Sequence, residues 1–139
     1  MNRFSVLAVS AAMLVVGTAN LARADEAIGG DGRALAKALI GYMITTYSCH
    51  GIMGSLDHYR AAKAIAVEIY ARMVGDRNKA VLAINELDQS IKAAEVDKMA
   101  EKKFKEKNLS EVQGLAVCQN MISDSLDDLE LARAKLNLL

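Results

Sequence analysis

Residues 35–53 read LAKALIGYMITTYSCHGIM, and the spacing of one set of side chains in this stretch decides the fold class. Members of the set recur at intervals of 4, 3, 4, 3 and 4 residues, which is the repeat of one face of an α-helix. They are Leu35, Leu39, Tyr42, Thr46, Cys49 and Met53. We predict that this helix ends within residues 50–55, where Gly51 and Gly54 suit left-handed C-terminal positions and Ser55 can cap the next helix.

The same repeat continues through two further segments. A helix over about residues 56–74 is predicted with the buried stripe Leu56, Tyr59, Ala62, Ala66, Ile69 and Met73. Gly75 then suits a helix end and Asp76 a helix start. The helix that follows has the predicted stripe Ala80, Ile84, Leu87, Ile91 and Ala94.

After Glu95 the apolar phase shifts to Val96, Met99 and Phe104 within a strongly charged stretch. We therefore expect a bend or a second short helix near residues 93–96, ending at Asn108. Ser110 and Gln113 have the spacing of a capping box, which predicts the start of the last helix. Its predicted inward side chains are Val112, Leu115, Cys118, Ile122, Leu126, Leu129 and Leu136.

These segments predict an all-α fold, a small antiparallel bundle of four to five helices. The chain has 139 residues, which is the size of one domain. We assign residues 25–139 to this domain and expect residues 25–31 to be a short glycine-containing lead.

The first 24 residues have the pattern of a secretory signal peptide. Arg3 supplies a positive start, residues 4–16 are an apolar stretch, and Ala22-Arg23-Ala24 is a small-residue cleavage site. The alternative is a membrane anchor, but the apolar stretch is short for a span. We expect a periplasmic or secreted protein beginning at Asp25, with no stable membrane insertion after cleavage.

Charge argues against a nucleic-acid partner. The whole chain has seventeen basic and seventeen acidic residues, and removal of residues 1–24 takes away two arginines and leaves a net charge of −2. A nucleic-acid-binding domain normally has a strongly basic face and a high isoelectric point.

Export also sets the expected state of the two cysteines, Cys49 and Cys118. In an oxidising compartment each has only the other to pair with inside the chain. Because both lie on predicted core stripes, we expect one disulfide that joins the first and last helices. A redox-active pair is the alternative, but neither cysteine belongs to a C-x-x-C motif.

The sequence contains few motifs that are typical of cofactor binding. Covalent haem attachment needs a second cysteine where Thr46 stands, so it is excluded. His50, Met53 and His58 offer imidazole and thioether ligands that suit copper, with Met43 nearby. We favour the simpler interpretation, with the methionines packing and both histidines exposed in a turn, and expect no cofactor. The acids of residues 124–130 lack the glycine of a calcium loop and are interpreted as a solvated helix face.

No nucleophile, base and acid occur at a recognisable spacing, so we do not expect an enzyme. We expect a protein that acts by binding another protein, with a small-ligand or copper-binding protein as the alternative. The candidate partner surface is Lys102, Lys103, Phe104, Lys105 and Lys107. The lysine-rich block of residues 98–107, which contains this surface, is a solvated face, docks an acidic partner, or pairs with the acidic last helix of the same molecule or of a second copy in a homodimer. Phe104 is either a core residue or an interface anchor.

An exported helical chain of this size with one disulfide resembles, in general plan only, periplasmic acid-stress chaperones and helical immunity proteins that neutralise toxins. The resemblance implies a chaperone, adaptor or immunity type of protein binding. No motif carries it, so no residue role is transferred.

Overall fold

The computed structural model describes residues 29–137, and this part of the chain forms five helices and no strand. The helices are α3 (Gly30–Met53), α4 (Asp57–Val74), α5 (Arg77–Ala93), α6 (Val96–Glu106) and α7 (Glu111–Lys135). The predicted all-α bundle of four to five helices is confirmed. The predicted signal peptide lies outside the described residues.

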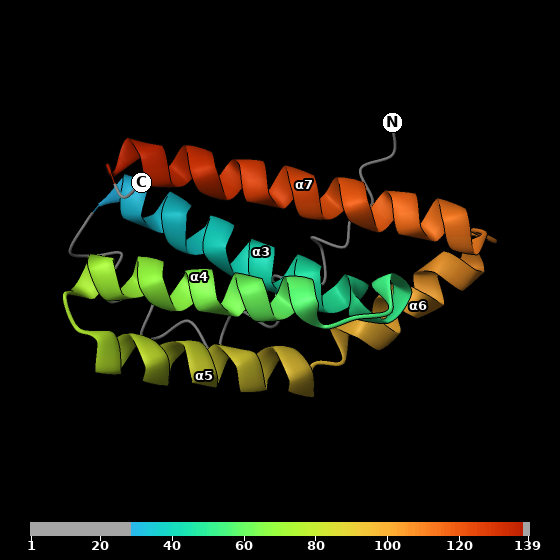
Figure 1. Cartoon of the computed structure of the whole chain (residues 1–139), viewed down its shortest axis with the longest axis horizontal. Helices are drawn as coiled ribbons and strands as arrows, with labels where there is room; N and C mark the ends of the chain where they lie inside the picture. Colours follow the sequence, from blue (N-terminus) through green and yellow to red (C-terminus); the bar gives the residue numbers. More distant parts are fainter. Residues whose placement is uncertain (1–28, 138–139) are drawn as a thin grey trace.

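Helix α3 is the centre of the bundle. It packs against α7, α4 and α6, while α5 packs against α4. In Figure 1 the helices α7, α3, α4 and α5 lie in this order from top to bottom, and α6 crosses at one end to join α5 to α7. Because three helices cover α3, its buried residues include Ile40 and Ile44 in addition to most of the predicted stripe.

Most helix ends follow from local chemistry and confirm the sequence predictions. Gly54 and Gly75 adopt left-handed conformations, with φ of 73° and 72°, directly after α3 and α4. The side chain of Asp76 accepts a hydrogen bond of 3.1 Å from the Lys79 amide at the start of α5. Ser110 and Gln113 form both hydrogen bonds of a capping box at the start of α7.

The chain does not continue straight from α5 into α6. Glu95, with φ of 52°, adopts a left-handed conformation between the two helices, which confirms the break predicted near residues 93–96. The start of α3 differs from the prediction. Gly30 and Asp31 are already helical, so the non-helical lead does not extend to residue 31.

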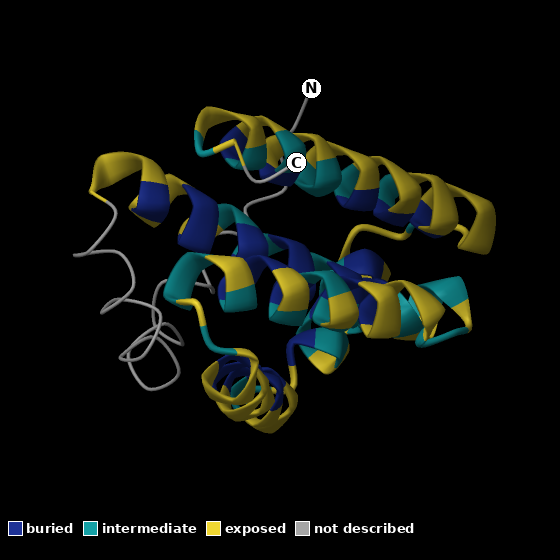
Figure 2. Ribbon diagram, turned by 60° about the vertical axis from the view of Figure 1, so that its left-hand side comes forward, coloured by how far each residue is buried: buried dark blue, intermediate teal, exposed yellow. Residues whose placement is uncertain are grey.

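The predicted disulfide is confirmed. Cys49 of α3 and Cys118 of α7 are bonded, their Cα atoms are 5.7 Å apart, and 69 positions of sequence separate them. Both residues are almost fully buried among the apolar side chains that join α3 to α7. Figure 2 shows that the buried residues of α7 lie on the side that faces the rest of the bundle.

The predicted inward face of α7 is wrong at its first two residues. Val112 is 77% exposed and Leu115 is 37% exposed, whereas Gly114 is buried. The reason is the helical phase, since a residue six positions before Cys118 lies about 120° away from it around an α-helix. Gly114 is four positions before Cys118 and occupies the buried place instead.

Among the helices of residues 29–137, none is both long enough and apolar enough to span a membrane.

Candidate functional site

Helix α6 carries the predicted partner surface, and its inner side fixes it to the bundle. Val96, Ala100 and Phe104 are buried on this side. The Phe104 ring lies against Gly114 of α7, where an added Cβ would come within 3.2 Å of it. Phe104 is therefore a core residue, and the alternative that placed it in an interface as an anchor is not what the structure shows.

The outer side of α6 bears lysines. Lys98, Lys102 and Lys105, at positions i, i+4 and i+7, are exposed and share one helix face. Lys107 directly after the helix is also exposed, whereas Lys103 is half-buried. The exposed members of the predicted surface are thus Lys102, Lys105 and Lys107, and only part of the lysine-rich segment is a solvated face.

A tight turn brings the end of α6 next to the start of α7. The Asn108 amide donates to the carbonyl of Lys105 at 3.0 Å, and the Leu109 amide donates to that of Phe104 at 3.2 Å. This turn places the exposed Val112 and Leu115 in the first turns of α7, directly after the lysines. We call the group Lys102, Lys105, Lys107, Val112 and Leu115 the α6–α7 corner.

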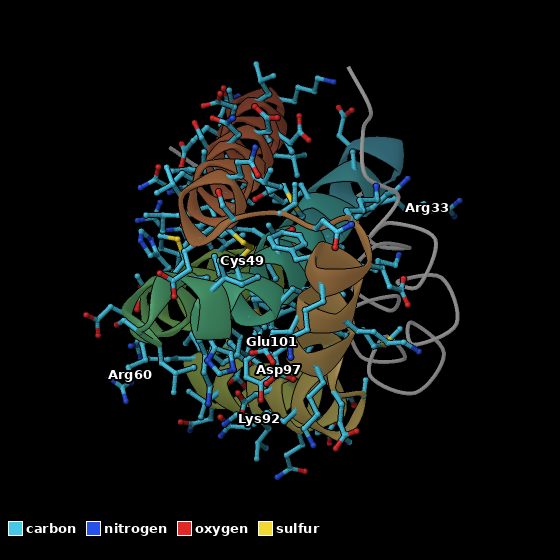
Figure 3. All side chains as sticks on the ribbon, turned by 90° about the vertical axis from the view of Figure 1, so that its right-hand side faces the viewer. Arg33, Cys49, Arg60, Lys92, Asp97 and Glu101 are labelled. Atoms are coloured by element: carbon cyan, nitrogen blue, oxygen red, sulfur yellow. A yellow bond between two sulfur atoms is a disulfide. The ribbon has the colours of Figure 1, made fainter. Side chains whose placement is uncertain are left out.

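A side-chain pair ties the first turn of α6 to the last turn of α3. His50 Nε2 and Asp97 Oδ2 are 3.0 Å apart, and both side chains are largely shielded from solvent. The Tyr47 ring lies next to the imidazole, with ring centroids 4.8 Å apart. His50 is therefore a half-buried residue inside α3, which corrects the prediction of an exposed turn histidine. Figure 3 looks onto this end of the molecule, with Asp97 and Glu101 labelled on α6.

A second polar cluster joins α4 to α5. The Tyr59 hydroxyl donates a hydrogen bond of 2.5 Å to Asp88 Oδ1, and Lys92 Nζ lies 3.2 Å from Asp88 Oδ2. Lys63 Nζ is 3.5 Å from the same oxygen. Tyr47 connects the two clusters, because its ring packs edge-on against that of Tyr59 with centroids 5.0 Å apart.

The electrostatics of this second cluster follow from its burial. Burial alone would raise the pKa of Asp88, but the hydrogen bonds from Tyr59 and Lys92 and the charge of Lys63 lower it below the usual value of 3.8. The pKa of Tyr59 is raised, first by burial and then by its hydrogen bond to the Asp88 carboxylate. The hydroxyl therefore stays protonated and the carboxylate stays charged across the neutral range.

Within residues 29–137, no hydrogen bond joins a serine hydroxyl to either cluster. Ser48 lies two positions before His50 on α3, and residues two apart do not face each other on a helix. The His50 and Asp97 pair therefore has no serine beside it from its own helix turn. The pair of His50 with Asp97 joins α3 to α6, and the pair of Tyr59 with Asp88 joins α4 to α5.

The residues considered as copper ligands have different surroundings in the structure. His50 is bonded to Asp97, His58 is exposed in the first turn of α4, and Met53 is the half-buried last residue of α3. Met43 is fully buried, as the packing interpretation requires. Within residues 29–137 no three or more His, Cys, Asp or Glu side chains are grouped so that they could hold a metal ion. The acids Asp124, Asp127 and Asp128 are exposed on α7, which agrees with a solvated helix face.

No protein-family model matches this chain, and comparison with curated proteins and with solved structures gives no match. The functional argument therefore depends on the residues of this chain alone.

Sequence reasoning missed both polar clusters. Asp97 lies 47 positions after His50, and Asp88 lies 29 positions after Tyr59, so neither spacing has the regularity of a helix face. One signal was present for Asp88. It follows Leu87, a predicted core residue, and a carboxylate beside a core position needs partners if it is buried.

Proposed function

We propose that this chain is an exported binding protein that recognises a protein partner with an acidic surface through the α6–α7 corner. The observation that carries the proposal is Val112, a β-branched apolar side chain that is 77% exposed in the first turn of α7, five positions after the exposed Lys107. Interfaces combine an apolar centre with a polar rim. Val112 and Leu115 supply the first element, and the lysines supply the second.

The positive charge of the lysines in the α6–α7 corner favours a partner with an acidic surface. Lys102, Lys105 and Lys107 lie within one and a half turns of one another at the same end of the molecule. A local group of like charges attracts a surface of opposite charge and accelerates association, an effect that salt weakens. The proposal covers a chaperone, an adaptor or an immunity protein, each of which acts by binding another protein.

The rigid attachment of α6 supports the same proposal. The buried Phe104, the pair of His50 with Asp97, and the left-handed Glu95 hold α6 at a fixed place relative to α3. A preformed surface binds without the entropic cost of ordering a flexible segment. The disulfide is typical of an oxidising compartment, which agrees with export.

Export is tested by the intact mass and N-terminal sequence of the protein recovered from the periplasm or medium. We expect the mature chain to begin at Asp25. A full-length chain retained in the membrane would contradict export without affecting the argument about the corner.

Partner binding is tested by placing a photo-crosslinking amino acid at Val112 and, as a control, at Leu131, which is 65% exposed at the other end of α7. We expect a discrete crosslinked protein partner from position 112 and none from position 131. Equal crosslinking from both positions would show that the corner has no special role, and a crosslink to a second copy of this chain would identify a homodimer instead of a different partner.

Charge reversal then tests the lysines. Changing Lys102, Lys105 and Lys107 to Glu should reduce the yield of the crosslink about tenfold at low salt, without a change in melting temperature. The matched control changes Lys37, Lys79 and Lys135 to Glu, since these are also exposed and produce the same change of net charge. If both triple variants bind equally, the acidic-partner proposal fails.

A further inference from the structure

The connection between α6 and α7 contains a motif that the proposed function does not use. It reads Asn108-Leu109-Ser110, which is the N-x-S pattern of an acceptor for N-linked glycosylation, and its middle residue is not proline. The chain has seven asparagines, and Asn108 is the one that is followed two positions later by a serine or threonine. The sequence therefore offers one acceptor of this kind.

The structure places this motif at the surface. Helix α6 ends at Glu106 and α7 begins at Glu111, so the motif lies in the turn between the two helices, which Figure 1 shows at one end of the molecule. Asn108 and Ser110 are exposed, while Leu109 between them is half-buried and packs against the core. An exposed turn of an exported protein is the usual place of an N-glycosylation acceptor.

The side-chain amide of Asn108 is available for modification. The residue has φ of 54°, a left-handed conformation that asparagine adopts more readily than most residues with a side chain. Within residues 29–137, its hydrogen bond is the one that the backbone amide donates to the Lys105 carbonyl at 3.0 Å. A sugar attached to the side-chain nitrogen Nδ2 therefore breaks no described contact of this part of the chain.

The third residue of the motif has to supply a hydroxyl group, and Ser110 keeps part of its hydroxyl free. The Ser110 oxygen accepts a hydrogen bond of 3.1 Å from the Gln113 amide, as the cap of α7. A serine hydroxyl has one O–H donor in addition to two acceptor lone pairs. The capping bond uses one lone pair and leaves the O–H group for recognition.

We propose that Asn108 is an N-glycosylation site, to which an oligosaccharyltransferase attaches an oligosaccharide from a lipid-pyrophosphate donor. Nδ2 of Asn108 attacks the anomeric carbon of the first sugar, and a C–N bond forms as the bond from this carbon to the pyrophosphate oxygen breaks. The lipid pyrophosphate leaves with the electron pair of the broken bond, and the nitrogen loses one proton to a base of the transferase. The proposal rests on the proposed export, which the disulfide supports, and does not rest on the identity of a partner.

The direct test is mass spectrometry of the protein recovered from the periplasm or medium of the cells that make it. We expect the peptide that contains Asn108 to carry an added mass that fragments by successive loss of sugar residues. The N-terminal sequence of the same sample is determined in parallel. A chain that begins at Asp25 with an unmodified Asn108 would overturn this proposal alone, whereas a chain that retains residues 1–24 would overturn export and this proposal with it.

Two variants of Ser110 separate glycosylation from the capping of α7. Threonine and aspartate both serve as N-cap residues, but only threonine keeps the hydroxyl group that the motif requires. Ser110→Thr should keep the sugar on Asn108, and Ser110→Asp should lose it. Melting temperatures of both variants, made in cells without the transferase, should be similar and show that each is folded. Equal glycosylation of the two variants would overturn the assignment to this motif.

A change of the acceptor itself locates the attached sugar. Asn108→Gly keeps the left-handed turn, because glycine adopts this conformation without steric cost, and it removes the acceptor nitrogen. We expect complete loss of the sugar. The control is Asn120→Gln, at an exposed asparagine of α7 that lies outside the motif, and it should retain the sugar. A sugar that persists in Asn108→Gly would be attached to another residue and would contradict the proposal.

Discussion

The contact between α3 and α7 and the contact between α4 and α5 are stabilised by different interactions. Between α3 and α7 the contact is apolar and covalent, because Leu39 and Leu129 are buried in the same core as the Cys49–Cys118 bond. Between α4 and α5 it is partly ionic, because the buried Asp88 collects Tyr59, Lys63 and Lys92. The first contact depends on the redox state of the solution, and the second depends on its pH.

The difference teaches how a chain without proline, tryptophan or many aromatic residues can fix its helices. Alanine-rich surfaces such as Ala62 and Ala66 of α4 allow helices to approach but bury little side-chain area. Specific links make up for the small area. A disulfide supplies one link and a satisfied polar cluster supplies the other.

Removing the disulfide should have the largest effect. Cys49→Ser and Cys118→Ser should each lower the free energy of unfolding by about 4 kcal/mol, because either change opens the same long loop in the unfolded chain. Urea unfolding measures the loss, and the chemically reduced wild-type protein is the control and should match both variants. Clearly unequal losses would show that one cysteine has a role besides the bond.

Tyr59→Phe breaks the polar contact while keeping the ring. We expect a loss of about 2 kcal/mol, since a buried hydrogen bond to a charged carboxylate is removed. Tyr47→Phe is the matched control, because within residues 29–137 the described contacts of Tyr47 are those of its ring with His50 and Tyr59. A loss as large for Tyr47 as for Tyr59 would assign the stability to ring packing instead.

Acid should weaken the α4–α5 contact selectively. The pKa of Asp88 in the folded protein is below its ordinary value of 3.8, so its stabilising contribution is fully present above that pH and is lost as the pH falls through the lowered pKa. Unfolding free energies measured at several pH values below about 4 should fall less steeply for Asp88→Asn than for the wild type. Asp57→Asn, at an exposed acid of the same helix pair, should keep the wild-type slope.

The smallest expected effect is a gain of stability on α3. Ser48 is 1% exposed, and its hydroxyl has no hydrogen-bond partner among residues 29–137. Ser48→Ala removes a buried, unsatisfied polar group and should raise the unfolding free energy by up to about 1 kcal/mol. In the control Ser125→Ala, a hydroxyl that donates to the Ile122 carbonyl is lost, and no gain is expected there. A loss on Ser48→Ala would show that its hydroxyl has a function in the core.

The sequence was most informative where structure depends on neighbouring residues. The caps at Asp76 and Ser110, the left-handed Gly75 and the break before Val96 all depend on hydrogen bonds or backbone angles within a few positions. Short sequence motifs are therefore sufficient to predict the geometry of these caps and of this break. The pairing of Cys49 with Cys118 was also predictable, because two cysteines allow one intramolecular bond.

The sequence was less informative where the structure depends on small residues or on contacts between residues far apart in the sequence. The prediction placed Val112 inward because it is apolar, but the buried position belongs to Gly114, whose missing side chain makes room for Phe104. A hydrophobic pattern gives weight to large side chains and ignores a glycine that a neighbouring ring covers. The links of His50 to Asp97 and of Tyr59 to Asp88 join different helices, so only the folded arrangement shows them.

The wide sequence separation of the two cysteines has a consequence for the order of folding. Of the described helices, a chain made from its N-terminus presents α3 first and α7 last, although α7 covers one side of α3. Helices α4 and α5 are adjacent in sequence and can pair early, because local contacts close short loops. Until α7 arrives, the apolar side of α3 stays uncovered and Cys49 remains a lone thiol, so the interval before oxidation is the period in which the nascent chain is most exposed to aggregation and to mispairing with other thiols.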